Sequence, residues 1–92
     1  MEKRRVRMIV KGKVQGVFYR DYVRIEAEKI GVLGFVRNLH DKTVEVVADG
    51  SEVQINKFIQ ACRKGSFLAS VDDVKVADYN GDEEFEEFEI RF

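Results

Sequence analysis

The first part of the chain alternates apolar and polar residues with the period of a β-strand. Val6, Met8 and Val10 occupy every second position of residues 4–11, and mostly basic side chains lie between them. Successive side chains of a strand point to opposite faces, so this pattern predicts a strand with one buried face. Two glycines interrupt the alternation over residues 12–20, which indicates a turn that leads from the strand into a helix.

Two later segments repeat apolar residues every three or four positions, which is typical of amphipathic α-helices. The first helix is expected over residues 21–30 and to end at Gly31, because glycine readily adopts the left-handed conformation that terminates a helix. Ser51 and Gln54 have the spacing of a capping box that opens the second helix, and Gly65 is expected to end it. The apolar stripes are Tyr19, Val23, Ala27 and Ile30 in the first segment and Ile55, Phe58, Ile59 and Cys62 in the second.

Shorter alternating segments predict the remaining strands and complete the order β-α-β-β-α-β, with one further strand. A turn at residues 40–42 is expected to join the second and third strands, and Asp49-Gly50 is expected to end the third. The order predicts one α+β domain over residues 1–92 with the ferredoxin-like split βαβ arrangement. In that arrangement two helices cover one face of an antiparallel sheet, here of four to five strands. The later strands are expected over residues 32–39 and 43–48, around Val74 and Val76, and over residues 88–92.

Composition narrows the class of protein. No apolar run approaches the ~20 residues of a membrane span, and the charged start followed by alternation is unlike a signal peptide, so no membrane partner is expected. The one cysteine, Cys62, forms no internal disulfide and is expected to be a buried thiol of a cytoplasmic protein. The one histidine, His40, cannot complete a Cys/His metal cluster, so we expect no metal and no other cofactor.

Charge is distributed unevenly along the chain. Residues 1–24 carry eight basic and two acidic side chains, whereas residues 72–92 carry nine acidic and two basic ones. Either the terminal strands present complementary faces in one sheet, or the basic end binds nucleic acid. The net charge of −1 and the lack of an aromatic strand typical of RNA-binding domains favour the first interpretation, so no nucleic-acid partner is expected.

Residues 12–20 combine the features of an anion-binding site. Gly12 and Gly16 permit a tight turn and a close approach of a ligand to backbone N–H groups. The start of the following helix offers unpaired N–H groups and a partial positive charge. Arg20 adds a planar fork of donors that suits phosphate or carboxylate. Taken one at a time, the glycines would indicate only a tight connection and the arginine only a solvated side chain.

Two motifs in the chain resemble the two signatures of the acylphosphatase family. The first signature is Gly-x-Val-Gln-Gly-Val-x-aromatic-Arg, which residues 12–20 match without a gap. The second is Gly-aromatic-small apolar-basic-Asn, which residues 34–38 match. The resemblance extends over nearly the whole chain, including the closing Phe-Glu-Ile of residues 88–90. The chain departs from the family at residues 39–43, which lack a turn glycine, and at residues 65–68, which lack proline, so rate and substrate preference stay open.

The resemblance implies hydrolysis of small-molecule acyl phosphates to a carboxylate and inorganic phosphate. It implies that Arg20 binds the phosphate, that Asn38 orients the attacking water, and that no metal or cofactor takes part. Inorganic phosphate or sulfate is then expected to inhibit the reaction, and the protein is expected to be a monomer. The backbone N–H groups implied to hold the phosphate belong to Gln15, Gly16, Val17, Phe18, Tyr19 and Arg20.

Two other functions remain alternatives, a non-catalytic acylphosphatase-like binding module and a ferredoxin-like RNA-binding domain. His40 titrates near neutrality but is expected to be a solvated turn residue, because this reaction needs no strong base. The acidic run of residues 82–87 is expected to be solvated rather than to bind a metal. Phe18 lies outside the helical stripe and either lines the substrate entrance or covers the core.

Overall fold

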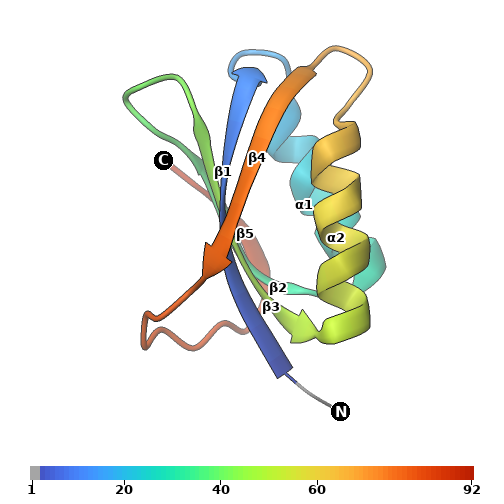
Figure 1. Ribbon diagram of the computed structural model, residues 1–92, viewed down its shortest axis with the longest axis vertical. Helices are drawn as coiled ribbons and strands as arrows, with labels where there is room; N and C mark the ends of the chain where they lie inside the picture. The colour runs from blue at the N-terminus through green and yellow to red at the C-terminus, as the bar shows by residue number, and fades with distance from the viewer. Residues whose placement is uncertain (1–2) are drawn as a thin grey trace.

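The computed structural model describes residues 3–92, which form a sheet with two α-helices packed on one of its faces (Figure 1). In chain order the elements are β1 (Lys3–Lys13), α1 (Tyr19–Ile30), β2 (Leu33–Asn38), β3 (Val44–Ser51), α2 (Glu52–Lys64), β4 (Ser70–Asp78) and β5 (Phe88–Arg91). The five strands lie in the order β4-β1-β3-β2-β5. This arrangement confirms the predicted ferredoxin-like α+β fold and its order of elements.

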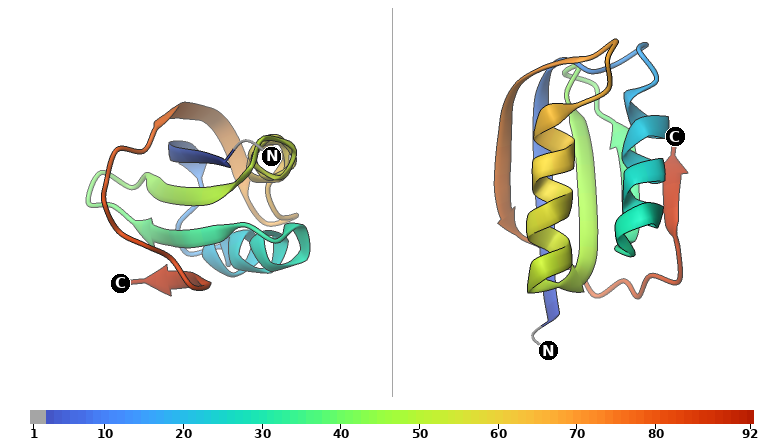
Figure 2. Two further views of the ribbon diagram at one scale, coloured as in Figure 1. Left: turned by 90° about the horizontal axis from the view of Figure 1, so that it is seen from below. Right: turned by 90° about the vertical axis from the view of Figure 1, so that its right-hand side faces the viewer.

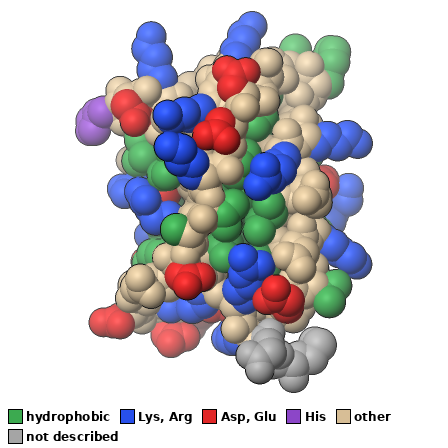
Figure 3. Space-filling view, viewed as in Figure 1, with side chains coloured by type: hydrophobic (Ala, Val, Ile, Leu, Met, Phe, Trp, Pro, Cys, Tyr) green, Lys and Arg blue, Asp and Glu red, His purple; other side chains and the backbone are tan. Residues whose placement is uncertain are grey.

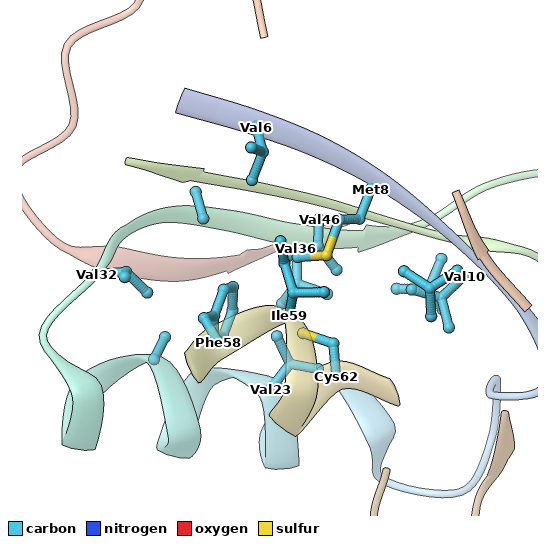
Figure 4. Close-up of a cluster of buried hydrophobic side chains, with 14 of the residues drawn as sticks. Val6, Met8, Val10, Val23, Val32, Val36, Val46, Phe58, Ile59 and Cys62 are labelled. Atoms are coloured by element: carbon cyan, nitrogen blue, oxygen red, sulfur yellow. The ribbon is translucent and has the colours of Figure 1, made fainter. Parts of the chain in front are cut away.

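The alternating residues of β1 supply the middle of the hydrophobic core. Val6, Met8 and Val10 are fully buried on the face that the helices cover, as the alternation predicted. Figure 4 shows Met8 and its neighbours in the sheet facing Ile59 and the other apolar residues of α2. Both helical stripes are confirmed, because every member is buried except Ile30, which is partly buried and packs against the core.

The helix ends follow the predicted capping chemistry. Gly31 adopts φ +97° directly after α1, and Gly65 adopts φ +71° after α2. The Ser51 hydroxyl accepts a hydrogen bond from the Gln54 backbone N–H at 3.2 Å, and the Gln54 side chain accepts one from the Ser51 N–H at 2.9 Å. α1 begins at Tyr19, two residues earlier than expected. Over residues 3–92, neither helix is long and apolar enough to cross a membrane.

The prediction that Asp49-Gly50 ends the third strand is wrong. β3 continues to Ser51, and α2 follows without an intervening loop. β3 is the central strand, and Asp49 is paired with Arg5 of β1 on one side and with Leu33 of β2 on the other. The Asp49 carboxylate also lies 3.0 Å from the Arg5 Nε atom. Backbone pairing on both sides and this ion pair outweigh the turn preference of Asp-Gly.

The prediction of an entirely antiparallel sheet is also wrong, because β5 runs parallel to β2. Residues 79–87 leave β4 at one edge of the sheet and cross the helix-free face to the opposite edge (Figure 2). The Tyr79 N–H donates to the Arg5 carbonyl at 3.1 Å, and the Gly34 N–H donates to the Glu87 carbonyl at 3.1 Å. The crossing segment thus reaches β2 near its first residues, so the chain can add a strand there only by running in the same direction.

Three basic residues of β1, Lys3, Arg5 and Arg7, form ion pairs with acidic residues of β3 rather than of the last strand. Arg7 donates to the buried carboxylate of Glu45, which also accepts a hydrogen bond from Arg37 of β2 at 2.5 Å. β1 and β5 are not neighbours in the sheet. The first and last strands therefore do not present complementary faces to each other, but the acidic stretch also includes residues of β4, which is paired with β1.

Candidate active site

Two glycines with positive φ shape the connection between β1 and α1. Gly12 has φ +133° at a bulge of β1, and a Cβ atom there would lie 2.1 Å from the backbone oxygen of Ser70 in β4. Gly16 has φ +72°, yet a Cβ atom there would meet no described atom within 4 Å. Gly12 is therefore needed for the close approach of β4. Gly16 is needed for its backbone conformation alone, and the space above it is open to a ligand.

Helix α1 begins without a side-chain cap. Phe18 occupies the N-cap position with φ +60°, and its side chain makes no capping hydrogen bond. A bulky residue in the left-handed region is strained, and such strain is found mostly at functional sites. The sequence left two roles open for Phe18, lining the substrate entrance or covering the core. Its side chain is 72% exposed, so it does not cover the core. The N–H groups of the first turn are left available to an anion.

A hollow of about 260 Å³ opens at the start of α1. Its buried residue Tyr19 donates a hydrogen bond of 2.8 Å from its hydroxyl to the backbone carbonyl of Cys62 in α2. Burial raises the pKa of Tyr19 above its ordinary value, so this hydroxyl stays protonated and keeps donating. The contact ties the start of α1 to α2 and keeps the hollow in place. The lining residues are Val14, Gly16, Phe18, Tyr19, Arg20 and Asp21.

Arg20 lies in the first turn of α1 with a half-buried side chain. Its Cζ atom lies 4.9 Å from the centroid of the Phe92 ring. Within residues 3–92, the guanidinium forms no hydrogen bond or ion pair with another residue. All of its donors are therefore available to a ligand, and the nearby helix N-terminus attracts the same kind of charge.

Gln15 has a structural role that the sequence did not reveal. Its side-chain amide donates to the Leu39 carbonyl at 3.0 Å and to the Thr43 carbonyl at 2.8 Å. These bonds join the β1–α1 connection to the turn between β2 and β3. Because both amide hydrogens are in use, only the backbone N–H of Gln15 is left for an anionic ligand. The signature contained the glutamine, but nothing in the sequence pattern indicated its partners.

Asn38 is the last residue of β2 and lies beside that turn. Its Oδ1 atom is buried and has no hydrogen-bond partner in the described part of the chain. Buried polar atoms of folded proteins are nearly always paired, so an unpaired one indicates a place for a water or a ligand. The Asn38 amide can accept a hydrogen bond through Oδ1 and donate two through Nδ2.

The fold brings the two signatures to the same end of the sheet. Val44 of β3 pairs with Val10 near the end of β1 on one side and with Asn38 on the other. The Gln15 hydrogen bonds hold the β1–α1 connection, which leads to Arg20 in α1, against the turn between β2 and β3. Lys and Arg side chains project from this end of the molecule, where the β1–α1 and α2–β4 loops lie (Figure 3). The region is therefore suited to an anionic ligand.

The remaining residues considered from the sequence lie outside this arrangement. His40 is exposed at the tip of the β2–β3 turn. Cys62 is a free, fully buried cysteine, and burial raises the pKa of its thiol to about 12, so it is a poor nucleophile at neutral pH. Residues 82–87 are largely exposed, and no group of side chains in residues 3–92 has the arrangement of a metal site.

Comparisons with known proteins identify relatives of this chain. The profile of the Acylphosphatase family matches residues 6–90. The acylphosphatase of Caldivirga maquilingensis is 45% identical over 89 residues, which cover 96% of this chain and 94% of that protein. The crystal structure of acylphosphatase from Bacillus subtilis superposes with a TM-score of 0.90 at 36% identity, covering 96% of this chain and 98% of the other.

A similar unit also occurs within a larger protein. The structure of T. kodakarensis HypF matches with a TM-score of 0.86 and 28% identity, covering 98% of this chain but only 12% of that one. The similarity to the acylphosphatases of Caldivirga maquilingensis and Bacillus subtilis is closer than the similarity to HypF, and it spans nearly the full length of both proteins. The two gap-free signatures, the fold and these matches together show that the chain belongs to the acylphosphatase family.

Proposed function

We propose that this protein hydrolyses small acyl phosphates, R–CO–O–PO₃²⁻, with water to a carboxylate and inorganic phosphate. The observation that carries the proposal is the Arg20 guanidinium, which has no hydrogen bond or ion pair within residues 3–92 and lies in the uncapped first turn of α1. Phosphoryl transfer depends mainly on positioning and on stabilising negative charge at the phosphoryl oxygens. The activity named for the relatives supports the same reaction.

The phosphoryl group binds between Arg20 and the backbone N–H groups of residues 15–20. The positive φ of Gly16 and the open space above it support a close approach of the phosphoryl oxygens to the backbone. The guanidinium forms charge-assisted hydrogen bonds in its own plane. In this role Arg20 supplies the positive charge that a metal ion supplies in many other phosphoryl-transfer enzymes.

Asn38 holds the attacking water. Its buried Oδ1, which has no partner within residues 3–92, accepts a hydrogen bond from the water and directs the water's lone pair at phosphorus. The P–O bond to the acyl group breaks as the new P–O bond forms, and the acyl oxygen leaves as a carboxylate. Because a carboxylate is a good leaving group, no general acid is required, and the proton of the water passes to the phosphate product or to solvent.

Steady-state hydrolysis of benzoyl phosphate and acetyl phosphate by the purified protein tests the proposal. We expect turnover well above the spontaneous rate, competitive inhibition by inorganic phosphate or sulfate, and no loss after treatment with excess chelator. Arg20→Gln serves as the inactive control. Hydrolysis no faster in the parental protein than in this variant would overturn the proposal, and activity restored only by added Mg²⁺ would overturn the metal-free site.

The same preparation tests the remaining expectations. A monomer is expected by light scattering, and a non-catalytic module would bind phosphate without turning over either substrate. Salt-dependent RNA binding that needed Arg5 and Arg7, without hydrolysis, would instead favour the nucleic-acid alternative. A cytoplasmic location is also part of the proposal, because Cys62 is a reduced thiol with no disulfide partner in the sequence.

A further inference from the structure

Phe92 lies next to the proposed catalytic machinery although it is far from both signatures in the sequence. β5 runs parallel to β2, and Arg91 is paired with Arg37. The next residues along the two strands are Phe92 and Asn38, so Phe92 lies at the level of Asn38. Figure 2 shows β5 running alongside α1 with its end toward the first turn of that helix. The Phe92 ring lies beside Arg20 at this end of the sheet.

The Arg20 Cζ atom lies over the Phe92 ring, 4.9 Å from the ring centroid. The ring is fully exposed to solvent, so the contact does not follow from packing of the ring into the core. An aromatic face engages the flat face of a guanidinium, whereas the N–H donors lie at its edges. Stacking therefore restricts the Arg20 side chain and leaves its donors free for phosphate.

The other stacked arginines show that this combination is particular to Arg20. Arg5 lies over the rings of Tyr79 and Phe85, but its Nη1 donates to the Gly81 carbonyl at 2.9 Å. Arg37 and Arg91 both lie over Phe35, and both form hydrogen bonds with glutamate side chains. Among the stacked arginines of residues 3–92, Arg20 alone has no hydrogen-bonded partner within the chain.

We propose that Phe92 is a positioning residue that holds the Arg20 guanidinium in its phosphate-binding orientation. The inference rests on the proposed role of Arg20 in binding phosphate. The ring takes the place that a carboxylate often has beside an arginine, but without neutralising the charge or occupying the donors. Loss of the ring frees the arginine to rotate, so part of its rotamer entropy is lost on binding phosphate instead of on folding.

The test is phosphate affinity by calorimetry together with kcat and KM for benzoyl phosphate. Phe92→Ala and Phe92→Leu should each weaken phosphate binding by about two- to fivefold, the range expected for an exposed cation–π contact. KM should rise by a similar factor. Phe92→Tyr, which keeps an aromatic face, should restore parental values. Val53→Ala removes another exposed apolar side chain, at the start of α2, and should change neither quantity.

A double-mutant cycle separates this inference from the proposed site. Phe92→Ala should have no further effect on phosphate affinity in an Arg20→Gln background, because the ring acts only through the guanidinium. If Arg20→Gln weakens phosphate binding but Phe92→Ala leaves it at the parental value, the positioning role is wrong and the site stands. If Phe92→Leu retains full affinity, or the effect persists without the arginine, the role is also wrong. If Arg20→Gln itself binds phosphate normally, the proposed site fails first.

Discussion

The side-chain amide of Gln15 donates a hydrogen bond of 2.8 Å to the backbone carbonyl of Thr43, 28 residues further along the chain. Together with the bond to Leu39, this contact joins the β1–α1 connection, directly before Arg20 in α1, to the turn that follows Asn38. The distance between Arg20, the proposed phosphate-binding group, and Asn38, the proposed water-binding group, therefore depends on Gln15. The Gln15 side chain need not contact the substrate to fulfil this role.

Replacing Gln15 should affect stability and turnover together. Gln15→Met keeps the length of the side chain but removes both donors and leaves two part-buried carbonyl groups without their partner. We expect a loss of about 1–3 kcal/mol in the free energy of unfolding. Turnover should fall by tenfold or more in protein that is still folded, because Arg20 and Asn38 are no longer held at a set separation. Urea unfolding and steady-state hydrolysis measure the two effects, and parental values of both would contradict the role.

Arg20 is expected to contact the phosphoryl group in the ground state and in the transition state. Arg20→Gln should weaken phosphate binding by about ten- to a hundredfold, as expected for the loss of hydrogen bonds to a charged group. Turnover should fall as well. Arg20→Lys keeps the charge but loses the planar fork, so it should also be severely impaired. Phosphate calorimetry beside turnover decides the matter, and near-parental function of the lysine variant would mean that charge alone suffices.

Asn38 is expected to contact only the attacking water. Asn38→Ala should lower turnover by about a hundredfold, because the water loses its orientation. Phosphate should still bind with nearly parental affinity, since no phosphate contact is removed. A loss of turnover at unchanged binding assigns the interaction to the transition state. Circular dichroism must first show that the variant is folded, because Asn38 also pairs with Val44 in the sheet. Full turnover in folded Asn38→Ala would exclude this role.

Glu45 should contribute to the pH dependence of stability. Burial by itself raises the pKa of this carboxyl, but hydrogen bonds from Arg7 and Arg37 outweigh burial and lower the pKa below its ordinary value of 4.5. A carboxyl with a lowered pKa stabilises the folded state above its ordinary pKa and loses this contribution as the pH falls through the folded value. The contribution is therefore complete near neutral pH and disappears progressively below about pH 4.5.

Glu45→Gln tests this assignment. At pH 7 the variant should be less stable by about 1–2 kcal/mol, a modest value because both arginines are half-exposed and partly screened by water. Its stability should also decline less steeply than that of the parental protein between pH 5 and pH 3. Thermal unfolding across this range provides the comparison. Parallel pH profiles for the two proteins would show that Glu45 is not the responsible group.

Local sequence patterns were sufficient for most of the fold. The alternation of Val6, Met8 and Val10 depends only on which face of one strand is buried, and all three are in the core. The helical stripes and the Ser51 capping box also involve residues only a few positions apart. Both signatures are also continuous segments, so Arg20 and Asn38 could be proposed as site residues from the sequence alone, before their surroundings were known.

Contacts between distant segments were decided by the tertiary structure. Asp49 lies in the middle of β3 instead of ending it, because two neighbouring strands pair with it. Residues 79–87 cross the sheet to an edge that no local pattern identifies, and the direction of β5 follows from that crossing. The same crossing brings Phe92 to Arg20.

The sequence by itself determined the order of the elements, the buried faces of β1 and of the two helices, and the residues of the two signatures, because neighbouring positions in one strand, helix or turn encode these features. The tertiary structure alone decided what surrounds those residues. Gln15 bonds to Leu39 and Thr43, the Asn38 Oδ1 is buried without a partner among the described residues, and the Phe92 ring lies against Arg20. Each of these relationships joins groups that are far apart along the chain, and strand pairing and core packing bring them together only once the whole domain is folded.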